Sequence, residues 1–223
     1  MLAVFLTASI TLKLSLLLVL FQPVFQGSSS ETFGSAVSFR SCELAHRNLT
    51  ENLTLDPDTA HYQLVLSKDG KRVCRGNSAV NTLPTNIKRF DHHISVLTHK
   101  GFTSGKHCWR VDTGNGKYWS MGVARETVRR KGNFNISPEE GIWAIKVWDG
   151  EYHGLTSPTE VLCLRKVPNV IWVYLDYEEE KVAFFNAVTE DHIFTFPKAS
   201  FSGERVFPWF EVWASDFHLT LLP

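Results

Sequence analysis

The 223-residue sequence has no excess of charge of either sign, because 23 Lys and Arg residues balance 23 Asp and Glu residues. Binding to a nucleic-acid backbone depends on a surplus of basic side chains, so this class of partner lacks its main electrostatic support. The sequence also contains no C-x-x-C pair and no His and Cys cluster with the spacing of a zinc site. We therefore expect a protein that uses no nucleic acid, no metal and no other cofactor.

The motifs that carry catalysis are missing as well. Residues 101–107, GFTSGKH, differ from a phosphate-binding loop, because three residues instead of four separate the glycines and His stands where Ser or Thr would bind magnesium. No G-x-S-x-G elbow is present. His107 and Cys108 are neighbours in an expected strand and would point to opposite faces, so they are not a base and a nucleophile. The sequence therefore predicts a protein that is not an enzyme.

Short apolar segments separated by turn residues fill the chain from Leu55 onward, and no sustained 3.6-residue apolar period follows the first 29 residues. Many short strands at such spacing predict an all-β fold, an antiparallel β-sandwich with little helix. We expect strands at residues 61–67, 94–98, 107–113, 118–124, 141–148, 161–164, 170–176, 181–186, 192–196, 206–213 and 218–222.

The centre of this sandwich is predicted where HCWRVDT (107–113) and YWSMGVA (118–124) flank the turn Gly114-Asn115-Gly116-Lys117. Asn-Gly steps supply the positive φ that short hairpins need, so the two segments are expected to pair with each other as a hairpin. A tryptophan on each arm would pack across that hairpin. Four tryptophans are expected in the core: Trp109, Trp119, Trp143 and Trp172.

The first 29 residues are predicted to be a signal peptide. The apolar run 14–21 follows Lys13 and has the length of a signal-peptide core, and small residues at Gly27 and Ser29 suit a cleavage site. A membrane span would prefer about 20 uninterrupted apolar residues. An uncleaved signal anchor is the alternative, and only then is membrane association expected. The mature protein is expected to be secreted.

Residues 30–51 are expected to form an irregular N-terminal extension, and residues 52–223 the main domain. The N-x-[ST] triplets at Asn48 and Asn52 are candidate glycosylation sites in a secreted chain. A third triplet at Asn135 is less favourable because Pro138 follows it.

Four cysteines in an oxidising compartment allow three complete pairings. Cys108 and Cys163 lie in expected strands, where a thiol behaves as a small apolar side chain. If the chain has one disulfide, we expect it between Cys42 and Cys74.

A protein-binding surface is predicted at turns near one end of the sandwich, where aromatic and basic side chains gather, because such side chains concentrate interface energy. Burial in the core is the alternative for each aromatic residue. The adjacent His92 and His93 are expected to be solvated loop residues, not ligands. The candidate partner-binding residues are Lys146, Trp148, Tyr152, Trp209 and Trp213.

Segments distributed from residue 52 to the end resemble the PRY-SPRY domain of butyrophilins and tripartite-motif proteins. They are LDPDTAH (55–61), SGKHCWRV (104–111), WSMGVAR (119–125), VRRKG (128–132), GIW (141–143), LDYE (175–178), FSGER (201–205) and PWF (208–210). The resemblance implies a sandwich of two sheets with loops gathered at one end. It also implies a basic pocket for anionic ligands, to which His107 and Arg125 would belong. The alternative is that the basic run at 125–131 is a solvated loop opposite acidic residues.

A leader joined almost directly to such a domain resembles the vespryns, the ohanin-like secreted proteins of reptile venoms, and residues 128–133 and 138–143 are similar to that group. This resemblance implies a non-enzymatic secreted toxin with neuroactive effects and leaves its receptor open. The four cysteines, the extension at 30–51 and a C-terminal half closer to butyrophilins depart from that group. The alternative is a butyrophilin-like fragment or isoform that binds a partner protein or an anionic ligand.

Overall fold

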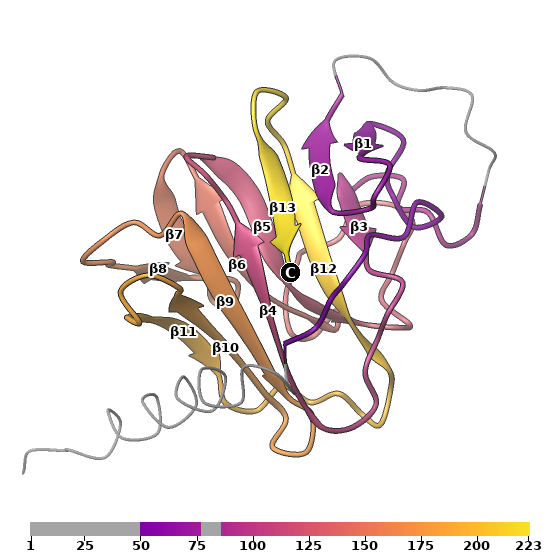
Figure 1. Cartoon of the computed structure of the whole chain (residues 1–223). Coiled ribbons are helices and arrows are strands. Elements are labelled where there is room, and N and C mark those ends of the chain that lie inside the picture. The colour runs from indigo at the N-terminus through magenta and orange to yellow at the C-terminus, as the bar shows by residue number, and fades with distance from the viewer. Residues whose placement is uncertain (1–49, 77–85) are drawn as a thin grey trace, which may run out of the picture. The chain divides into compact units, whose positions relative to one another are not determined.

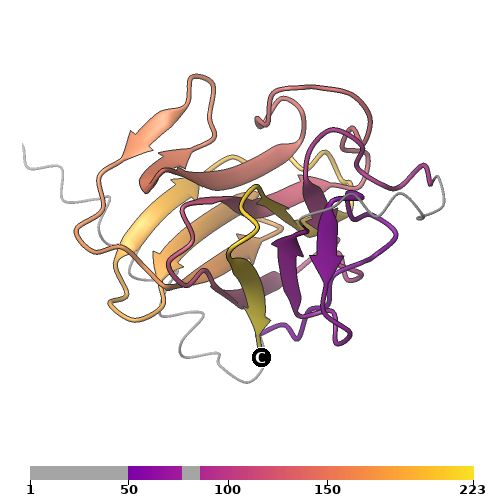
Figure 2. The ribbon, with the colours of Figure 1, turned by 90° about the horizontal axis from the view of Figure 1, so that it is seen from above.

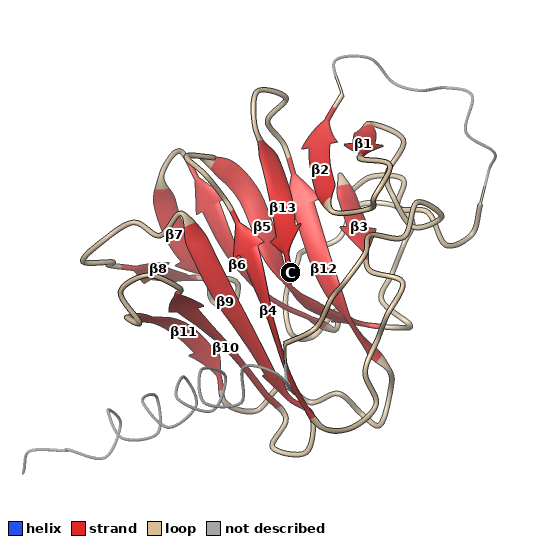
Figure 3. Cartoon of the chain, viewed as in Figure 1, coloured by secondary structure: helices blue, strands red, loops and turns tan. Residues whose placement is uncertain are grey.

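The computed structural model describes residues 50–76 and 86–223, and every regular element in these ranges is a β-strand (Figures 1 and 3). The strands form two sheets, and all of the pairings between strands are antiparallel. The two sheets enclose a common apolar core. The expected all-β antiparallel sandwich is therefore confirmed.

The first sheet has seven strands in the order β1-β2-β13-β4-β9-β10-β11, and the second has six in the order β3-β12-β5-β6-β7-β8. The strands of the first sheet are β1 (Leu64–Leu66), β2 (Arg72–Arg75), β13 (His218–Leu222), β4 (Lys106–Asp112), β9 (Val170–Asp176), β10 (Lys181–Asn186) and β11 (His192–Phe196). The strands of the second are β3 (Ser95–Leu97), β12 (Val206–Val212), β5 (Tyr118–Arg125), β6 (Ile142–Trp148), β7 (Glu151–Gly154) and β8 (Glu160–Leu162). The C-terminal strand β13 lies beside β2, near the start of the described chain (Figure 2).

The predicted hairpin between β4 and β5 is wrong in its pairing, although both strands exist. β4 pairs with β13 and β9 in the first sheet, whereas β5 pairs with β12 and β6 in the second. The turn at 113–117 thus carries the chain from one sheet to the other. Trp109 and Trp119 both lie in the core between the sheets, 1% and 0% exposed, and they enter it from different sheets instead of packing across one hairpin.

The core follows from the alternation of side chains along each strand. In β5 and β6, Trp119 and Trp143 lie in the core between the sheets, while Ala124 and Ala144 belong to a separate apolar cluster on the outer face of the second sheet. All four tryptophans expected in the core are buried, and Trp109, Trp119 and Trp143 lie in the core between the sheets. Trp172 instead belongs to a separate apolar cluster of the first sheet.

Two strands, β2 and β7, were not predicted from the sequence. β2 has basic residues at both ends, and β7 contains a single large apolar residue, Tyr152, so neither has the apolar run that predicts a strand. The predicted turn Asp149-Gly150 joins β6 to β7 with positive φ at both residues, 51° and 86°. A two-residue turn of this kind is the usual connection of a tight hairpin, and it places Trp148 opposite Glu151.

The disulfide prediction needs correction. Cys74 is a free thiol, so the pairing of Cys42 with Cys74 is wrong; Cys42 itself lies outside the described residues. Cys108 is disulfide-bonded, and its backbone bridges Thr50 at the start of the described chain. Cys163 is a free, exposed thiol.

Several predictions on the N-terminal region fall outside the described residues: the signal peptide (1–29), the extension up to residue 49, and the sequon at Asn48. Asn52 is described and exposed, and its Oδ1 accepts a hydrogen bond from Lys71 Nζ, so glycosylation there stays a prediction. Within residues 50–76 and 86–223, no helix has the length and apolar character of a membrane span.

Candidate functional site

A row of polar side chains crosses the outer face of the second sheet. Ser95 on β3 pairs with Glu211 on β12, Glu211 with Ser120 on β5, Ser120 with Lys146 on β6, and Lys146 with His153 on β7. Residues opposite one another in neighbouring strands point to the same face. The five polar side chains therefore lie side by side on this face. The neighbouring row on the same face is apolar and contains Trp209 on β12 and Ala144 on β6.

Glu211 is the unusual member of this row because its carboxylate is buried, with 1% of the residue exposed. His93 Nδ1 lies 3.1 Å from Glu211 Oε1, and His93 Nε2 lies 3.0 Å from the carbonyl oxygen of Phe134. A carbonyl only accepts, so Nε2 carries a hydrogen, and Nδ1 and Oε1 share one further proton between them. Glu211 Oε2 is buried without a hydrogen bond of acceptable geometry in the described chain.

Burial raises the pKa of the Glu211 carboxyl above its ordinary value. The His93 ring, the Lys146 ammonium and the Ser95 hydroxyl act in the opposite direction and offset part of this shift. The carboxyl group is thus poised to gain or lose a proton closer to neutral pH than an exposed glutamate.

His93, Lys146 and Glu211 line a cavity of about 630 Å³, which we call the Glu211 cavity. His92, His93 and Phe134 contribute to it from the loops before β3 and before β6, and the loop after β7 contributes residues 155–159. Lys146, Glu211 and Trp213 line it from the sheet. Its size falls within the range of pockets that bind small ligands or protruding partner side chains.

An aromatic cluster borders the cavity. The ring of Trp148 is edge-on to those of Tyr118 and Trp213, with centroid distances of 5.2 and 5.4 Å, and Trp148 is 48% exposed. Lys146 Nζ lies 4.7 Å from the ring centroid of Trp148 and 4.9 Å from that of Trp213. The Tyr118 hydroxyl donates a hydrogen bond to Asp149 at 3.1 Å, which ties the cluster to the β6–β7 turn.

Of the five predicted partner-binding residues, Lys146, Trp148 and Trp213 lie together in the structure. The other two, Tyr152 and Trp209, are buried. Tyr152 is 5% exposed because it occupies the inward position of β7, where its ring meets Trp119 edge-on at 6.0 Å. Trp209 is fully buried: it does point to the outer face of the sheet, but it lies within the apolar cluster there. Neither side chain can contact a partner in this conformation.

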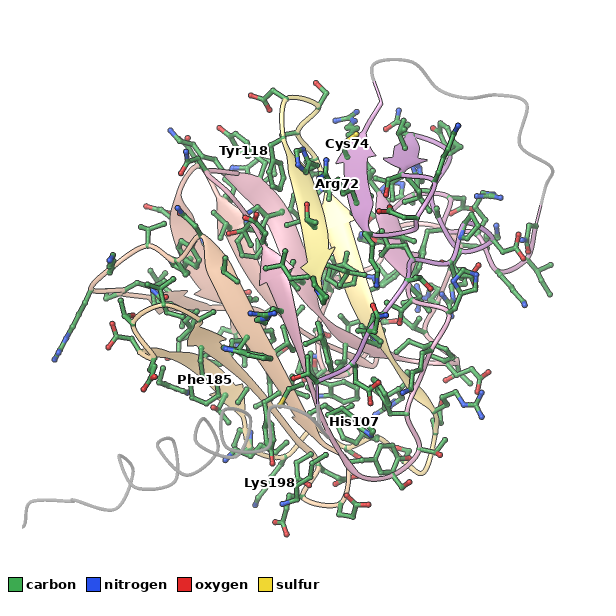
Figure 4. The ribbon with its side chains drawn as sticks, in the orientation of Figure 1. Arg72, Cys74, His107, Tyr118, Phe185 and Lys198 are labelled. Atoms are coloured by element: carbon green, nitrogen blue, oxygen red, sulfur yellow. The ribbon has the colours of Figure 1, made fainter. Side chains whose placement is uncertain are left out.

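His107 and Arg125, the residues predicted to form an anionic pocket, both bond to groups within the protein. His107 Nδ1 lies 2.8 Å from Glu51 Oε1 and its Nε2 lies 2.7 Å from the carbonyl oxygen of Ser104. Arg125 donates from Nε to the carbonyl oxygen of Ser200 at 3.1 Å and stacks over Trp143. Neither side chain lines the Glu211 cavity. Figure 4 shows His107 at the opposite end of the sandwich from Tyr118.

His93 and Glu211 are the site residues that the sequence-based prediction missed. His93 was expected to be solvated, but it is a hydrogen-bond partner of a buried carboxyl group that lies 118 residues further along the chain. The available signal was the strand VFPWFEV, in which Glu211 is the only charged residue. A carboxylate in an otherwise apolar strand is rarely buried without a specific partner.

Among the residues that the structure describes, no group of three or more His, Cys, Asp or Glu side chains could hold a metal ion. The site instead offers one exposed indole, a hollow beside it, and polar atoms at the floor of that hollow. These are the features of a surface that receives a partner's side chain.

Comparison with known protein families identifies two consecutive matches. Residues 53–102 match the SPRY-associated domain, PRY, and residues 106–222 match the SPRY domain. Human E3 ubiquitin-protein ligase TRIM38 is 42% identical over 163 residues, which cover 73% of this chain and 35% of TRIM38. Mouse butyrophilin subfamily 2 member A2 is 37% identical over 172 residues, which cover 77% of this chain and 33% of the butyrophilin. The chain thus spans about a third of the length of these relatives.

Two solved structures share the architecture. A chain of the stonustoxin structure aligns with a TM-score of 0.64 and 26% identity, covering 78% of this chain and 27% of that chain. The TRIM65 PSpry domain aligns with a TM-score of 0.68 and 18% identity, covering 81% of this chain and 93% of that domain. The second likeness supports the fold.

Proposed function

Since this chain belongs to the SPRY domain family and carries the SPRY-associated PRY segment, we propose that it is a non-enzymatic module that binds a partner protein. The binding surface in this proposal is the outer face of the second sheet, from the aromatic cluster of Tyr118, Trp148 and Trp213 to the Glu211 cavity. Lys146 belongs to both parts.

The exposure of Trp148 is the single observation that carries this proposal. Its indole is 48% exposed although it is packed against two aromatic rings and lies beside a large cavity. Tryptophan is enriched among the residues that dominate interface energies, particularly where a pocket adjoins it. Lys146 supplies a polar group at the same position, and a partner that covers the indole would also cover this ammonium.

The test measures how tightly the partner protein, once it is captured with the wild-type chain, binds to two variants of the full chain. Trp148→Ala should weaken binding by about 2 kcal/mol or more, or about 30-fold. Val188→Ala is the matched control, because it truncates another exposed apolar side chain, 71% exposed, in the turn between β10 and β11 of the other sheet. Equal affinities of wild type, Trp148→Ala and Val188→Ala would refute the proposed surface.

We further propose that the protein is secreted and acts as a vespryn-type venom toxin with neuroactive effects. The structural likeness to stonustoxin, a toxin by its name, supports the toxin assignment. The signal-peptide pattern of residues 1–29 supports export. N-terminal sequencing of protein released to the medium should begin between residues 27 and 31. Membrane-bound protein that still contains residues 14–21 would favour an anchored form.

Relatives among the butyrophilins support a second candidate, a butyrophilin-like fragment or isoform whose domain binds a partner protein or an anionic ligand. The two candidates differ in where the protein acts. Purified protein added outside cultured neurons should change their firing if it is a toxin, and the Trp148→Ala variant should lose the effect. Absence of any such effect, together with retention of the protein in the producing cell, would favour the butyrophilin-like candidate.

A further inference from the structure

The basic run that ends the β5 strand and begins the following loop contains one arginine whose donors are not fully used. Arg129 Nη2 lies 3.3 Å from Glu140 Oε1, and Lys131 Nζ donates to the carbonyl oxygens of Asn86 and Arg89 at 3.1 and 2.8 Å. Arg130 donates from Nη2 to the carbonyl oxygen of Glu126 at 3.0 Å. Its Nη1 is buried and has no hydrogen-bond partner in the described chain.

Arg130 is also held in an apolar setting. Its guanidinium lies over the ring of Phe90, 4.8 Å from the ring centroid, and Phe90 is completely buried. Burial lowers the pKa of Arg130 to about 10, and the nearby carboxylates of Asp56 and Glu126 offset this effect only in part. A desolvated cation with an unused donor is costly unless a further acceptor binds to it.

Arg130 lines a second cavity, of about 390 Å³, which we call the Arg130 cavity. Two more cations, Lys88 and Arg205, line it, and both are exposed without a side-chain hydrogen bond or ion pair among the described residues. The carboxylates of Asp56 and Glu126 face the same space. The three cations therefore outnumber the two anions.

The anions are not all free to neutralise those cations. Asp56 Oδ1 accepts a hydrogen bond from the Asp58 N–H at 2.9 Å and lies 3.8 Å from His99 Nε2, and His99 also lines the cavity. No residue of the Arg130 cavity lines the Glu211 cavity, so the two are separate sites.

We propose that the Arg130 cavity binds an oxyanion, a phosphate group, through Arg130, Arg205 and Lys88. The planar guanidinium offers a fork of N–H donors that matches phosphate oxygens, and the Lys88 ammonium adds a point charge. Residues from both matched segments form the site, since Lys88 lies within the PRY match and Arg130 and Arg205 lie within the SPRY match. The phosphate can come from a small phosphorylated molecule or from a phosphorylated side chain of a protein.

Calorimetric titration of the full chain with inorganic phosphate tests the site. We expect saturable binding that weakens at high salt. Arg205→Gln and Lys88→Gln should each weaken it by about two- to fivefold, because exposed charges are screened by solvent. Arg165→Gln is the matched control, since Arg165 is an exposed arginine between β8 and β9 and should leave the affinity unchanged.

Two further variants keep the test decisive. Arg130→Gln should abolish phosphate binding, and a melting curve shows whether it is still folded. Glu126→Gln should have the opposite sign and tighten binding, because it removes a carboxylate from the cavity without deleting a cation. If Arg130→Gln unfolds the protein, the test rests on the other two variants: phosphate binding should be weaker in Arg205→Gln and tighter in Glu126→Gln.

A phosphoserine peptide and its unphosphorylated form distinguish the two sources of the phosphate group. Tighter binding of the phosphopeptide than of inorganic phosphate indicates a phosphorylated protein side chain, and equal affinity indicates a small phosphorylated molecule. Absence of saturable phosphate binding at millimolar concentrations would overturn the proposal. Binding that Arg205→Gln and Glu126→Gln both leave unchanged would also overturn it.

Discussion

The rings of Trp148 and Trp213 pack edge-on, with centroids 5.4 Å apart and an interplanar angle of 76°. Trp148 ends β6 and Trp213 follows β12, two strands that are separated in the sheet by β5. The contact spans three strands, so the exposed indole rests on a rigid part of the fold. Edge-to-face aromatic pairs contribute about 0.5–1.5 kcal/mol beyond the area that they bury.

Trp148→Ala should therefore lower the free energy of unfolding by about 1–3 kcal/mol, because it removes edge-to-face contacts with both Tyr118 and Trp213. Trp109→Ala removes an indole that is 1% exposed and should cost about 3–5 kcal/mol. Denaturant unfolding of both variants measures the difference. If Trp148→Ala is as unstable as Trp109→Ala, the indole is a structural residue and not a contact for a partner.

The inward position of Tyr152 leads to a second prediction. Tyr152→Ala should destabilise the domain by about 3 kcal/mol or more, because it opens a cavity beside Trp119. Glu151→Ala is the neighbouring control: this side chain is exposed and should change stability by less than about 0.5 kcal/mol. Thermal melting of the two variants provides the comparison, and similar melting temperatures would show that Tyr152 is not part of the core.

The sequence predicts the fold class well because alternation and turn residues are local signals. It predicts the boundaries of β9, β10, β11 and β13 as the structure has them. It does not predict which strands pair, since β4 and β5 each have the pattern of a half-buried strand in either sheet. Their connecting turn is compatible with a hairpin and with a crossing between sheets, and only packing of the whole chain decides between them.

The site was predicted only in part, because the sequence shows local alternation and not tertiary contacts. Lys146 and Trp148 lie two residues apart on one strand and must share a face, which local alternation reveals. In β7 the same alternation applies, but a four-residue strand with one large apolar residue does not show which face is buried. The contact of His93 with Glu211 depends on tertiary structure alone, because the two residues are 118 positions apart.

The raised pKa of Glu211 makes stability depend on pH. Its folded pKa lies above the ordinary value of 4.5, so the folded state binds more protons than the unfolded state in the interval between them. The contribution of Glu211 to stability is then present below about pH 4.5 and is lost as the pH rises through the folded pKa.

Glu211→Gln removes this titration while keeping the shape of the side chain. The free energy of unfolding of wild type minus that of Glu211→Gln should fall as the pH rises from about 4 to 7. Denaturant unfolding at several pH values measures it. A difference that is constant, or that grows with pH, would show that the pKa of the buried carboxyl is not raised.

Asp176 should behave in the opposite way. Burial alone would raise the pKa of its carboxyl, but Lys106 and Tyr174, which bind its Oδ2 at 2.9 and 2.8 Å, lower the pKa below the ordinary value of 3.8. Its contribution to stability is present above about pH 3.8 and is lost as the pH falls through the folded pKa.

Asp176→Asn should accordingly lower the free energy of unfolding by about 1–3 kcal/mol at neutral pH, because it removes the ion pair with Lys106 and weakens the hydrogen bond from the buried Tyr174 hydroxyl. The deficit should shrink as the pH is lowered below 3.8. Asp112→Asn, at the end of the neighbouring strand β4 in a half-buried position, is the control and should have a smaller effect. A deficit for Asp176→Asn that does not change in acid would contradict the role of the ion pair.

Amide hydrogen exchange of the full chain, with and without its captured partner, tests the proposed binding surface most directly. We expect slower exchange on binding in residues 135–137 and 156–159, which border the Glu211 cavity, and in the Asp149-Gly150 turn beside Trp148. Residues 104–107, at the opposite end of the sandwich (Figure 4), should exchange at an unchanged rate. Protection confined to residues 104–107, with none around the cavity, would contradict it.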